Sequence, residues 1–261
     1  MNEIEDLKKQ YLERKSIQLP GTGRNFGLID ISSKREDAIL FAPGAPMTAE
    51  LLENFILFLA IKTKKRILCP LHPNLGFKTN PKIQRPAALL EIFQMTDSVS
   101  LVGHSYGGMD IVRMLMHCLE NNISLEKLEN VILINSAGMA KNSFFGHVSR
   151  FSKYIKSGKT EEETEFLKKW NELCQSQGLW KTLVELFDLA NSRLEGSLKI
   201  LKNAGIKISV ICTDDDLLQC SISDNVVFQK LSLETKGNHN GIIFNPDVYG
   251  ANNLLDLILK S

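Results

Sequence analysis

The stretch SVSLVGHSYGGMDIVRMLM, residues 98–116, decides the fold. An apolar run typical of a buried strand stops at Gly103, and an apolar run with helical spacing begins at Met109. The residues between them leave room only for a sharp strand-to-helix turn with Ser105 at its apex. Gly103 and Gly107 remove the side chains that would collide with the neighbouring strand and helix. The stretch therefore predicts that Ser105 projects alone above a sheet as a nucleophile; the alternative is a structural G-x-S-x-G turn.

Short β-branched runs alternate with longer helical runs on both sides of this turn. Runs typical of strands lie at 37–43, 66–71, 131–137 and 208–213, and a glycine-rich turn within 15–32 predicts an antiparallel hairpin at the sheet edge. This alternation predicts an α/β fold, in which a mostly parallel central sheet is flanked by helices on both faces.

Residues 140–204 are different in kind, because they contain no convincing strand and at least two amphipathic helical patterns. The first pattern opens with a capping box from Thr160 to Glu163, and the second ends at Gly205. We therefore expect a helical lid insert at 140–204 on a core made of residues 1–139 and 205–261.

Composition and charge narrow the range of partners. The chain has 261 residues, 43% of them hydrophobic, and its 31 basic and 30 acidic residues are scattered along it. Because no region carries a strong field of one sign, we expect no nucleic-acid partner, and no apolar run is long enough to span a membrane. The charged N-terminus lacks a signal sequence, and the five cysteines form no CxxC pair, which predicts packed thiols and a cytoplasmic location.

A serine hydroxyl needs a base to accept its proton before it attacks a carbonyl carbon, so the predicted turn requires a histidine. Of the five histidines, His239 lies in a loop rich in glycine and asparagine just before the last predicted helix. A parallel sheet delivers the side chains of such loops to its carboxyl edge. His239 is therefore the predicted base; the alternative is a loop histidine that caps the helix.

The histidine in turn needs a carboxylate to orient it. The strand at 131–137 is followed by no carboxylate, whereas the strand at 208–213 is followed by Asp214, Asp215 and Asp216. The order serine, aspartate, histidine along the chain is the one expected for this kind of turn. The residues alone leave open which of the three aspartates is the acid, or whether the run is only a solvated turn.

The negative charge that develops on an attacked carbonyl oxygen requires preorganised N–H donors. One donor is the backbone N–H of Tyr106, which follows Ser105 at the start of the predicted helix. The loop after the strand at 37–43 offers Gly44 and Ala45, while proline at the next position has no N–H. We expect Ala45 to supply the second donor of an oxyanion hole.

Together these motifs resemble those of the α/β-hydrolase fold superfamily, in particular its serine hydrolases and esterases with a helical lid. The resemblance extends over almost the whole chain from about residue 17. It is carried by GHSYGG at 103–108, ICTDDD at 211–216, GNHN at 237–240 and the APGAP loop at 42–46. It implies that the acid stands three residues beyond Thr213, at Asp216.

The sequence thus predicts a serine hydrolase with the catalytic residues Ser105, Asp216 and His239. We expect it to cleave an ester-like bond, in a carboxylic ester, a lipid ester or a thioester, through an acyl-enzyme and with neither a cofactor nor a metal ion. The expected substrate is a small molecule with an apolar acyl portion, for which Phe144 and Phe145 are candidate contacts, with lid packing as their alternative role. Acyl transfer and non-catalytic ligand binding are the alternative functions.

Overall fold

The structure is a computed structural model. It describes residues 3–13, 15–19, 24–31, 37–44, 47, 49–71, 81–139, 149, 164, 167–168, 171–172, 188, 192–215, 232–247 and 251–259. Most of the predicted insert at 140–204 therefore lies outside the described residues.

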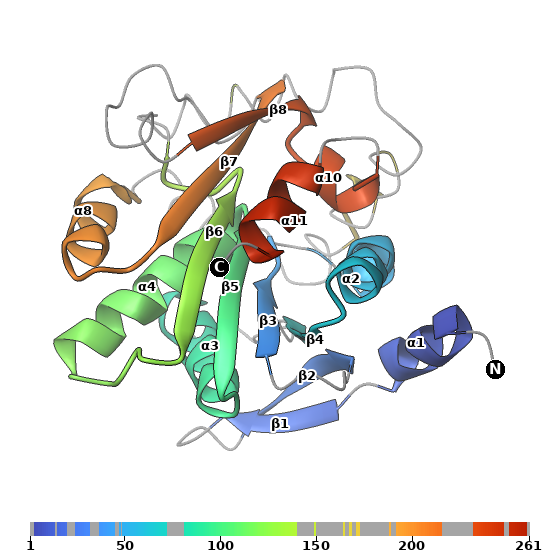
Figure 1. The fold of residues 1–261 in the computed structure, drawn as a ribbon, viewed down its shortest axis with the longest axis horizontal. Coiled ribbons are helices and arrows are strands. Elements are labelled where there is room, and N and C mark those ends of the chain that lie inside the picture. The colour runs from blue at the N-terminus through green and yellow to red at the C-terminus, as the bar shows by residue number, and fades with distance from the viewer. Residues whose placement is uncertain are drawn as a thin grey trace.

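Eight strands and seven helices are described (Figure 1). The strands are β1 (Lys15–Leu19), β2 (Arg24–Ile31), β3 (Asp37–Ala42), β4 (Arg66–Leu71), β5 (Ser98–His104), β6 (Leu128–Ile134), β7 (Ile208–Asp215) and β8 (Ser232–Asn238). The helices are α1 (Glu3–Leu12), α2 (Ala49–Thr63), α3 (Pro81–Gln94), α4 (Tyr106–Glu120), α8 (Glu195–Asn203), α10 (Gly241–Phe244) and α11 (Ala251–Leu259).

The strands form one sheet in the order β1-β2-β4-β3-β5-β6-β7-β8. The β1–β2 and β2–β4 pairs are antiparallel, and every other pair is parallel. The prediction of a mostly parallel sheet with an antiparallel hairpin at one edge is confirmed. Because β3, β5, β6, β7 and β8 run in the same direction, the loops that follow them meet at one edge, which we call the carboxyl edge.

The sheet separates two hydrophobic cores. Consecutive strand residues point to opposite faces, so that Leu40 belongs to one core and Phe41 to the other. The first core is covered by α3, α4 and α8, and the second by α1, α2, α10 and α11 (Figure 1). Strands buried on both faces read as continuous apolar runs, which is why β3, β5 and β6 could be found in the sequence.

Three described elements are absent from the sequence-based prediction: α1, β8 and α10. Helix α1 is fixed to the body by Tyr11, whose side chain is buried and whose hydroxyl donates a hydrogen bond to the carbonyl oxygen of Ala49. At the other end of the chain, β8 adds a parallel strand beside β7. Helix α8 was predicted as part of the insert, and the structure packs its Leu198 and Leu201 into the same core as Met109 of α4.

The cysteines correct one expectation. Cys69 and Cys118 are free and buried, as packed thiols should be. Cys212 on β7 is instead disulfide-bonded. The prediction of a thiol is therefore wrong for Cys212, and the inference of a reducing compartment loses that support.

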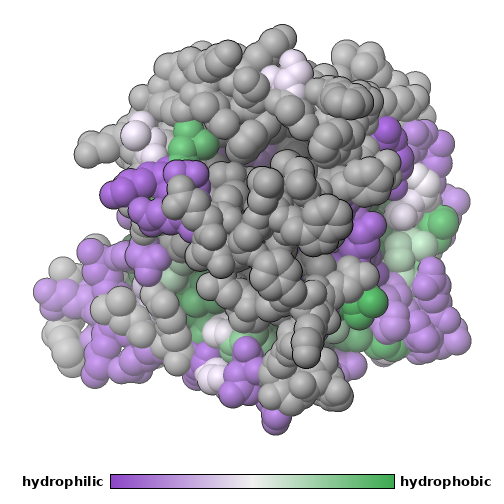
Figure 2. Space-filling view, turned by 180° about the vertical axis from the view of Figure 1, so that it is seen from behind, coloured by the Kyte–Doolittle hydropathy of each residue, from purple (hydrophilic) through white to green (hydrophobic). Residues whose placement is uncertain are grey.

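The described part of the surface mixes polar and apolar residues. On the face shown in Figure 2, the hydrophobic residues form small patches among hydrophilic ones. None of the helices within the described ranges has the length and hydropathy needed to cross a membrane.

Candidate active site

Ser105 stands in the turn between β5 and α4, in a backbone conformation that a serine rarely adopts. Its φ is 53° and its ψ is −119°. Such a conformation costs of order 1 to 3 kcal/mol and persists only where the surroundings hold it. Here the Ser105 N–H donates to the carbonyl of Ile134 at 2.9 Å, and the Ser105 carbonyl accepts the N–H of Ala137 at 2.9 Å. Strand β6 and the residues after it therefore hold the strained residue through both its N–H and its carbonyl group.

The glycines of this turn allow a very close approach to the end of β3. A Cβ atom on Gly107 would overlap the carbonyl oxygen of Ala42. A Cβ atom on Gly44 would lie 2.9 Å from the Cβ of Ser105, so the loop after β3 lies directly against the serine. This is the loop from which the second oxyanion donor was predicted, although Ala45 itself is outside the described residues.

His239 directly follows β8, and its imidazole meets the serine. The distance between His239 Nε2 and Ser105 Oγ is 2.9 Å, within hydrogen-bonding range. The two residues are 4% and 9% exposed, so bulk water does not compete strongly for this contact. An imidazole whose Nε2 accepts from the hydroxyl carries its own proton on Nδ1, which leaves Nδ1–H to donate to an acid.

The backbone of His239 is held by two side chains. Its carbonyl oxygen accepts a hydrogen bond from His104 Nε2 at 2.9 Å and another from Asn135 Nδ2, also at 2.9 Å. His104 and Asn135 are both buried; His104 is the last residue of β5, and Asn135 directly follows β6. The loop that carries the imidazole is therefore tied to β5 and β6.

Asn135 also joins this loop to β7. Its Oδ1 accepts the backbone N–H of Thr213 at 2.9 Å, and its Nδ2 donates to Thr213 Oγ1 at 2.9 Å. Its φ of 44° is a conformation that asparagine tolerates better than most residues. One buried amide thus connects the serine's neighbouring strand, the histidine loop and the strand that leads to the three aspartates.

The end of β7 lies beside the end of β8. Asp215 is paired in register with Asn238, so the next residue along each strand is Asp216 and His239 respectively. The side chains of Asp214 and Asp215, and the whole of Asp216, are outside what the structure describes. Phe144 and Phe145, the candidate substrate contacts, lie outside it too.

Tyr106 has a side-chain environment that the sequence did not reveal. As the first residue of α4, its N–H is one of the helix N-terminal donors that have no partner within the helix. Its ring is buried, and its hydroxyl donates a hydrogen bond to Asp188. Burial of the phenol, together with the nearby charge of Asp110, raises the pKa of Tyr106.

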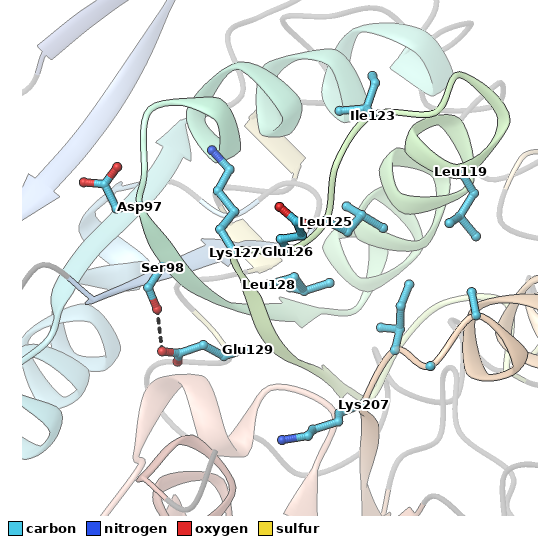
Figure 3. Close-up of a pocket in the computed structure, with 13 residues that line it drawn as sticks. Asp97, Ser98, Leu119, Ile123, Leu125, Glu126, Lys127, Leu128, Glu129 and Lys207 are labelled. Atoms are coloured by element: carbon cyan, nitrogen blue, oxygen red, sulfur yellow. Dashed lines mark hydrogen bonds between the residues drawn. The ribbon is translucent and has the colours of Figure 1, made fainter.

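A pocket lies at the opposite edge of the sheet, where the parallel strands begin. It has a volume of about 670 Å³ and is lined by residues such as Asp97, Glu126 and Lys207 (Figure 3). Figure 3 also shows the hydrogen bond from Ser98 to Glu129 in its wall. Ligands of open α/β sheets bind outside the carboxyl ends of the strands, whereas this pocket lies at the other edge of the sheet, away from Ser105.

No metal site is found in the part of the chain that the structure describes. Within those ranges, no group of three or more histidine, cysteine, aspartate or glutamate side chains is placed to hold a metal ion.

Several solved structures resemble this chain over nearly its whole length. A bacterial membrane phospholipase A has a TM-score of 0.67 at 14% identity, covering 98% of this chain and 89% of that chain. An esterase of Pyrococcus furiosus has a TM-score of 0.63 at 13% identity, covering 97% and 92%. The thioesterase domain from the curacin biosynthetic pathway has a TM-score of 0.60 at 15% identity, covering 94% and 99%. No family model and no curated protein sequence matches the chain.

Proposed function

We propose that this chain, which has the α/β-hydrolase fold, is a serine hydrolase that cleaves an ester-like bond. The observation that carries the proposal is the 2.9 Å contact between Ser105 Oγ and His239 Nε2. The contact joins a strained serine to a buried histidine from 134 residues away in the chain, at the edge of the sheet where this fold places its ligands. A nucleophile and a base in this relation are what acyl transfer requires.

The chemistry begins with proton transfer. As Ser105 Oγ attacks the carbonyl carbon of the substrate, its proton passes to His239 Nε2, and the carbonyl oxygen becomes an oxyanion. When this tetrahedral intermediate collapses, Nε2–H returns the proton to the leaving alcohol or thiol, and the acyl group stays on Ser105. A water molecule then attacks the acyl carbon while giving a proton to His239 Nε2. When the second tetrahedral intermediate collapses, Nε2–H returns that proton to Ser105 Oγ and the acid is released.

The proposed oxyanion hole consists of the N–H groups of Tyr106 and Ala45. The position of Tyr106 at the start of α4 supports its role, because the N-terminal N–H groups of a helix favour negative charge nearby. For Ala45 the support is indirect: its neighbour Gly44 lies against Ser105.

The proposed acid is Asp216. Its support is the register of the last two strands, because Asp215 and Asn238 are paired and each is followed at once by a member of the proposed triad. A carboxylate there would accept the Nδ1–H of His239, keep the imidazole in its productive tautomer and stabilise the imidazolium that forms during the reaction.

The proposed substrate is a small ester or thioester with an apolar acyl portion. The similar proteins named above are a phospholipase, an esterase and a thioesterase, which supports this class of bond. We further propose that residues 140–204 form a helical lid and that Phe144 and Phe145 contact the acyl chain. A fully buried aromatic side chain contributes of order 1 to 3 kcal/mol, enough to discriminate between acyl lengths.

The test is a series of aryl esters from acetate to dodecanoate, with the matching thioesters, assayed with the wild-type protein and Ser105→Ala. The proposal is supported if the wild-type protein turns over these substrates and Ser105→Ala does not. Added methanol then shows whether the acyl group is transferred to water or to an alcohol. If the wild-type protein releases no more product than Ser105→Ala on every substrate, the proposal fails.

The acyl-length preference has its own variant and control. Replacing Phe144 and Phe145 together by alanine should raise KM for long acyl chains more than for acetate. Ile83→Ala removes an apolar side chain that is 66% exposed on α3, outside the proposed lid, and should leave KM unchanged at every length. Equal changes at all lengths in the double variant would show that the two phenylalanines do not contact the acyl chain.

A further inference from the structure

We propose that Asp188 is a positioning residue for the oxyanion hole, holding the side chain of Tyr106 so that the backbone N–H of the same residue points at the reacting carbonyl. The inference rests on the proposed function, and it adds a residue that no sequence motif indicates. Asp188 is 82 residues from Tyr106 along the chain, in the region predicted as the insert.

The contacts of Asp188 come from two helices of the core. Its carboxylate accepts a pair of hydrogen bonds from Arg113 of α4, Nη2 to Oδ1 at 2.9 Å and Nη1 to Oδ2 at 3.0 Å. Lys82 Nζ of α3 lies 2.6 Å from Oδ1. The hydroxyl of Tyr106 donates to Oδ2. The side chain of Asp188 is only 2% exposed, and its carboxylate is contacted by three side chains from α3 and α4.

The carboxylate is charged across the neutral pH range. Burial alone would raise the pKa of Asp188, but hydrogen bonds from Arg113, Lys82 and Tyr106 outweigh it and hold the pKa below its usual value. A charged acceptor makes a stronger hydrogen bond to the Tyr106 hydroxyl than a neutral one would.

The ring of Tyr106 is held from its face as well as from its hydroxyl. The guanidinium carbon of Arg85 lies 4.5 Å from the ring centroid, and that of Arg113 lies 5.9 Å from it. A tyrosine side chain has two rotatable bonds, so fixing both the ring and its hydroxyl also fixes the direction of its Cα–Cβ bond. The backbone N–H is attached to that same Cα, and the next residue back is Ser105. Contacts made by Asp188 therefore constrain the orientation of the proposed oxyanion donor.

Stability alone is a weak explanation for such a cluster. Burying a charged carboxylate costs free energy, and an apolar replacement of a buried ion pair is often neutral or stabilising. A geometric role would explain why these charges are buried. The proposed reaction depends on the orientation of the Tyr106 N–H, and Tyr106 is the residue that the cluster contacts.

A second buried aspartate serves as a matched control. Asp30 on β2 accepts two hydrogen bonds from Arg66, at 2.8 and 2.7 Å, and its Oδ2 lies 2.5 Å from Lys15 Nζ. Its side chain is 1% exposed. It has the arginine and the lysine but no tyrosine, and it belongs to the antiparallel part of the sheet, with Lys15 on the edge strand β1.

The experiment compares Asp188→Asn, Tyr106→Phe and Asp30→Asn on one aryl ester and on its thionoester. The sulfur of a thiocarbonyl accepts hydrogen bonds poorly, so a thionoester draws little benefit from an oxyanion hole. We expect Asp188→Asn and Tyr106→Phe to lower kcat for the ester about tenfold to a hundredfold, with KM and the thionoester rate changed less than about threefold. Asp30→Asn should leave both rates within about twofold while lowering the unfolding midpoint.

Each outcome decides between clear alternatives. The proposal is overturned if Asp188→Asn behaves like Asp30→Asn, or if it loses the ester and thionoester rates in equal measure. Should Asp188→Asn not fold, Tyr106→Phe, which removes only the hydroxyl, and Asp188→Glu, which keeps the charge and should recover part of the ester rate, decide in its place. Wild-type protein without esterase activity would instead refute the proposed function, and the positioning role with it.

Discussion

The two edges of the parallel sheet both carry polar networks, partly buried at the amino edge and buried at the carboxyl edge, but the networks differ in kind. At the amino edge, Glu129 of β6 accepts hydrogen bonds from Ser98, from Ser100 at 2.9 Å and from Lys65 at 3.0 Å. Lys65 also lies 3.1 Å from Asp37. Opposite charges face each other there, and burial of Glu129 is outweighed by these hydrogen bonds, so that its pKa is lowered.

At the carboxyl edge the side-chain contacts of Ser105, His239 and Asn135 are made by hydroxyls, imidazoles and amides. Ser105 and Asn135 have positive φ angles, and the hydroxyl of Ser105 lies 2.9 Å from the imidazole Nε2 of His239. The comparison teaches that burial and hydrogen bonding do not by themselves mark a reactive site. The amino edge also has a residue with a positive φ, Lys64, but its serine hydroxyls donate to the carboxylate of Glu129. What distinguishes the carboxyl edge is a serine that is itself strained and whose hydroxyl meets an imidazole. Substitutions at the two edges should therefore separate loss of turnover from loss of stability.

The largest effect is expected for Ser105→Ala, which should lower kcat about ten-thousandfold to a millionfold. Its unfolding midpoint should stay at the wild-type value, because the turn tolerates a small side chain. Ser105→Gly should be equally inactive but more stable than Ser105→Ala by about 1 kcal/mol, since glycine accepts a φ of 53° without strain. Thermal unfolding and ester assays check both. Hydrolysis at a near wild-type rate by either variant would show that Ser105 is not the nucleophile.

The aspartate series comes next. Asp216→Asn should lose about four decades in kcat, as expected for the acid that orients a catalytic imidazole. Asp214→Asn and Asp215→Asn serve as controls of identical chemistry and should keep activity within about tenfold. All three are assayed on one ester from pH 6 to 9, with unfolding midpoints measured alongside. If Asp214→Asn or Asp215→Asn is the inactive variant instead, that aspartate is the acid. If all three variants remain active, the proposed triad is refuted.

Two asparagines, one near each end of β6, sharpen the comparison further. Asn135 holds the histidine loop at the carboxyl edge, while Asn130, near the start of β6, donates from Nδ2 to the carbonyl of Leu257 at 2.9 Å. Changing either to aspartate keeps the shape and removes the amide donor. We expect Asn135→Asp to lower kcat about tenfold to a hundredfold through misplacement of His239, and Asn130→Asp to change it less than about twofold. Equal losses in kcat would show that Asn135 has only a structural role.

The smallest effect on turnover is expected for Glu129→Gln at the amino edge. Its kcat should stay within about twofold of the wild-type value, while the free energy of unfolding at pH 7 falls by about 1 to 3 kcal/mol because the charge-assisted hydrogen bonds are weakened. Urea unfolding measures the second quantity. A loss of turnover without a loss of stability would mean that the amino edge takes part in the reaction.

The pH dependence of that stability has a definite sign. Because the folded-state pKa of Glu129 is lowered, its contribution is present above the unfolded-state pKa of about 4.3 and is lost as the pH falls through the lower folded-state value. The difference in unfolding free energy between the wild-type protein and Glu129→Gln should therefore be constant from pH 7 to about 5 and shrink below about 4. A difference that grows on acidification would contradict the assignment.

Much of the fold could be predicted because strands buried on both faces of a parallel sheet appear in the sequence as continuous apolar runs. The observed sheet contains the strands that these runs predict. Strand β8 could not, because it is an edge strand with a single neighbour, and SLETKGN holds only one large apolar residue. Helix α1 was not predicted because half of its residues are charged. Its one aromatic side chain, Tyr11, is buried in the folded protein, but a single such residue gives no recognisable helical pattern in the sequence.

Some residues of the candidate site could also be predicted from the sequence, and others could not. Ser105 and His239 carry local signals, the glycines around one and the loop around the other. Asn135 and Asp188 carry none, because their roles depend on which side chains three-dimensional packing brings to them. No spacing in the sequence shows that Asn135 reaches Thr213 and His239 at once, or that Asp188 accepts a hydrogen bond from the Tyr106 hydroxyl.

The most direct test of the central claim is labelling with a fluorophosphonate followed by peptide mass spectrometry. Such a probe reacts with a serine only where a base and an oxyanion hole activate it. The account predicts a single adduct on Ser105, absent from Ser105→Ala, strongly slowed in His239→Ala and formed at the wild-type rate in Asn130→Asp. An adduct that persists on another residue of Ser105→Ala, or a wild-type protein that takes up no label, would contradict it.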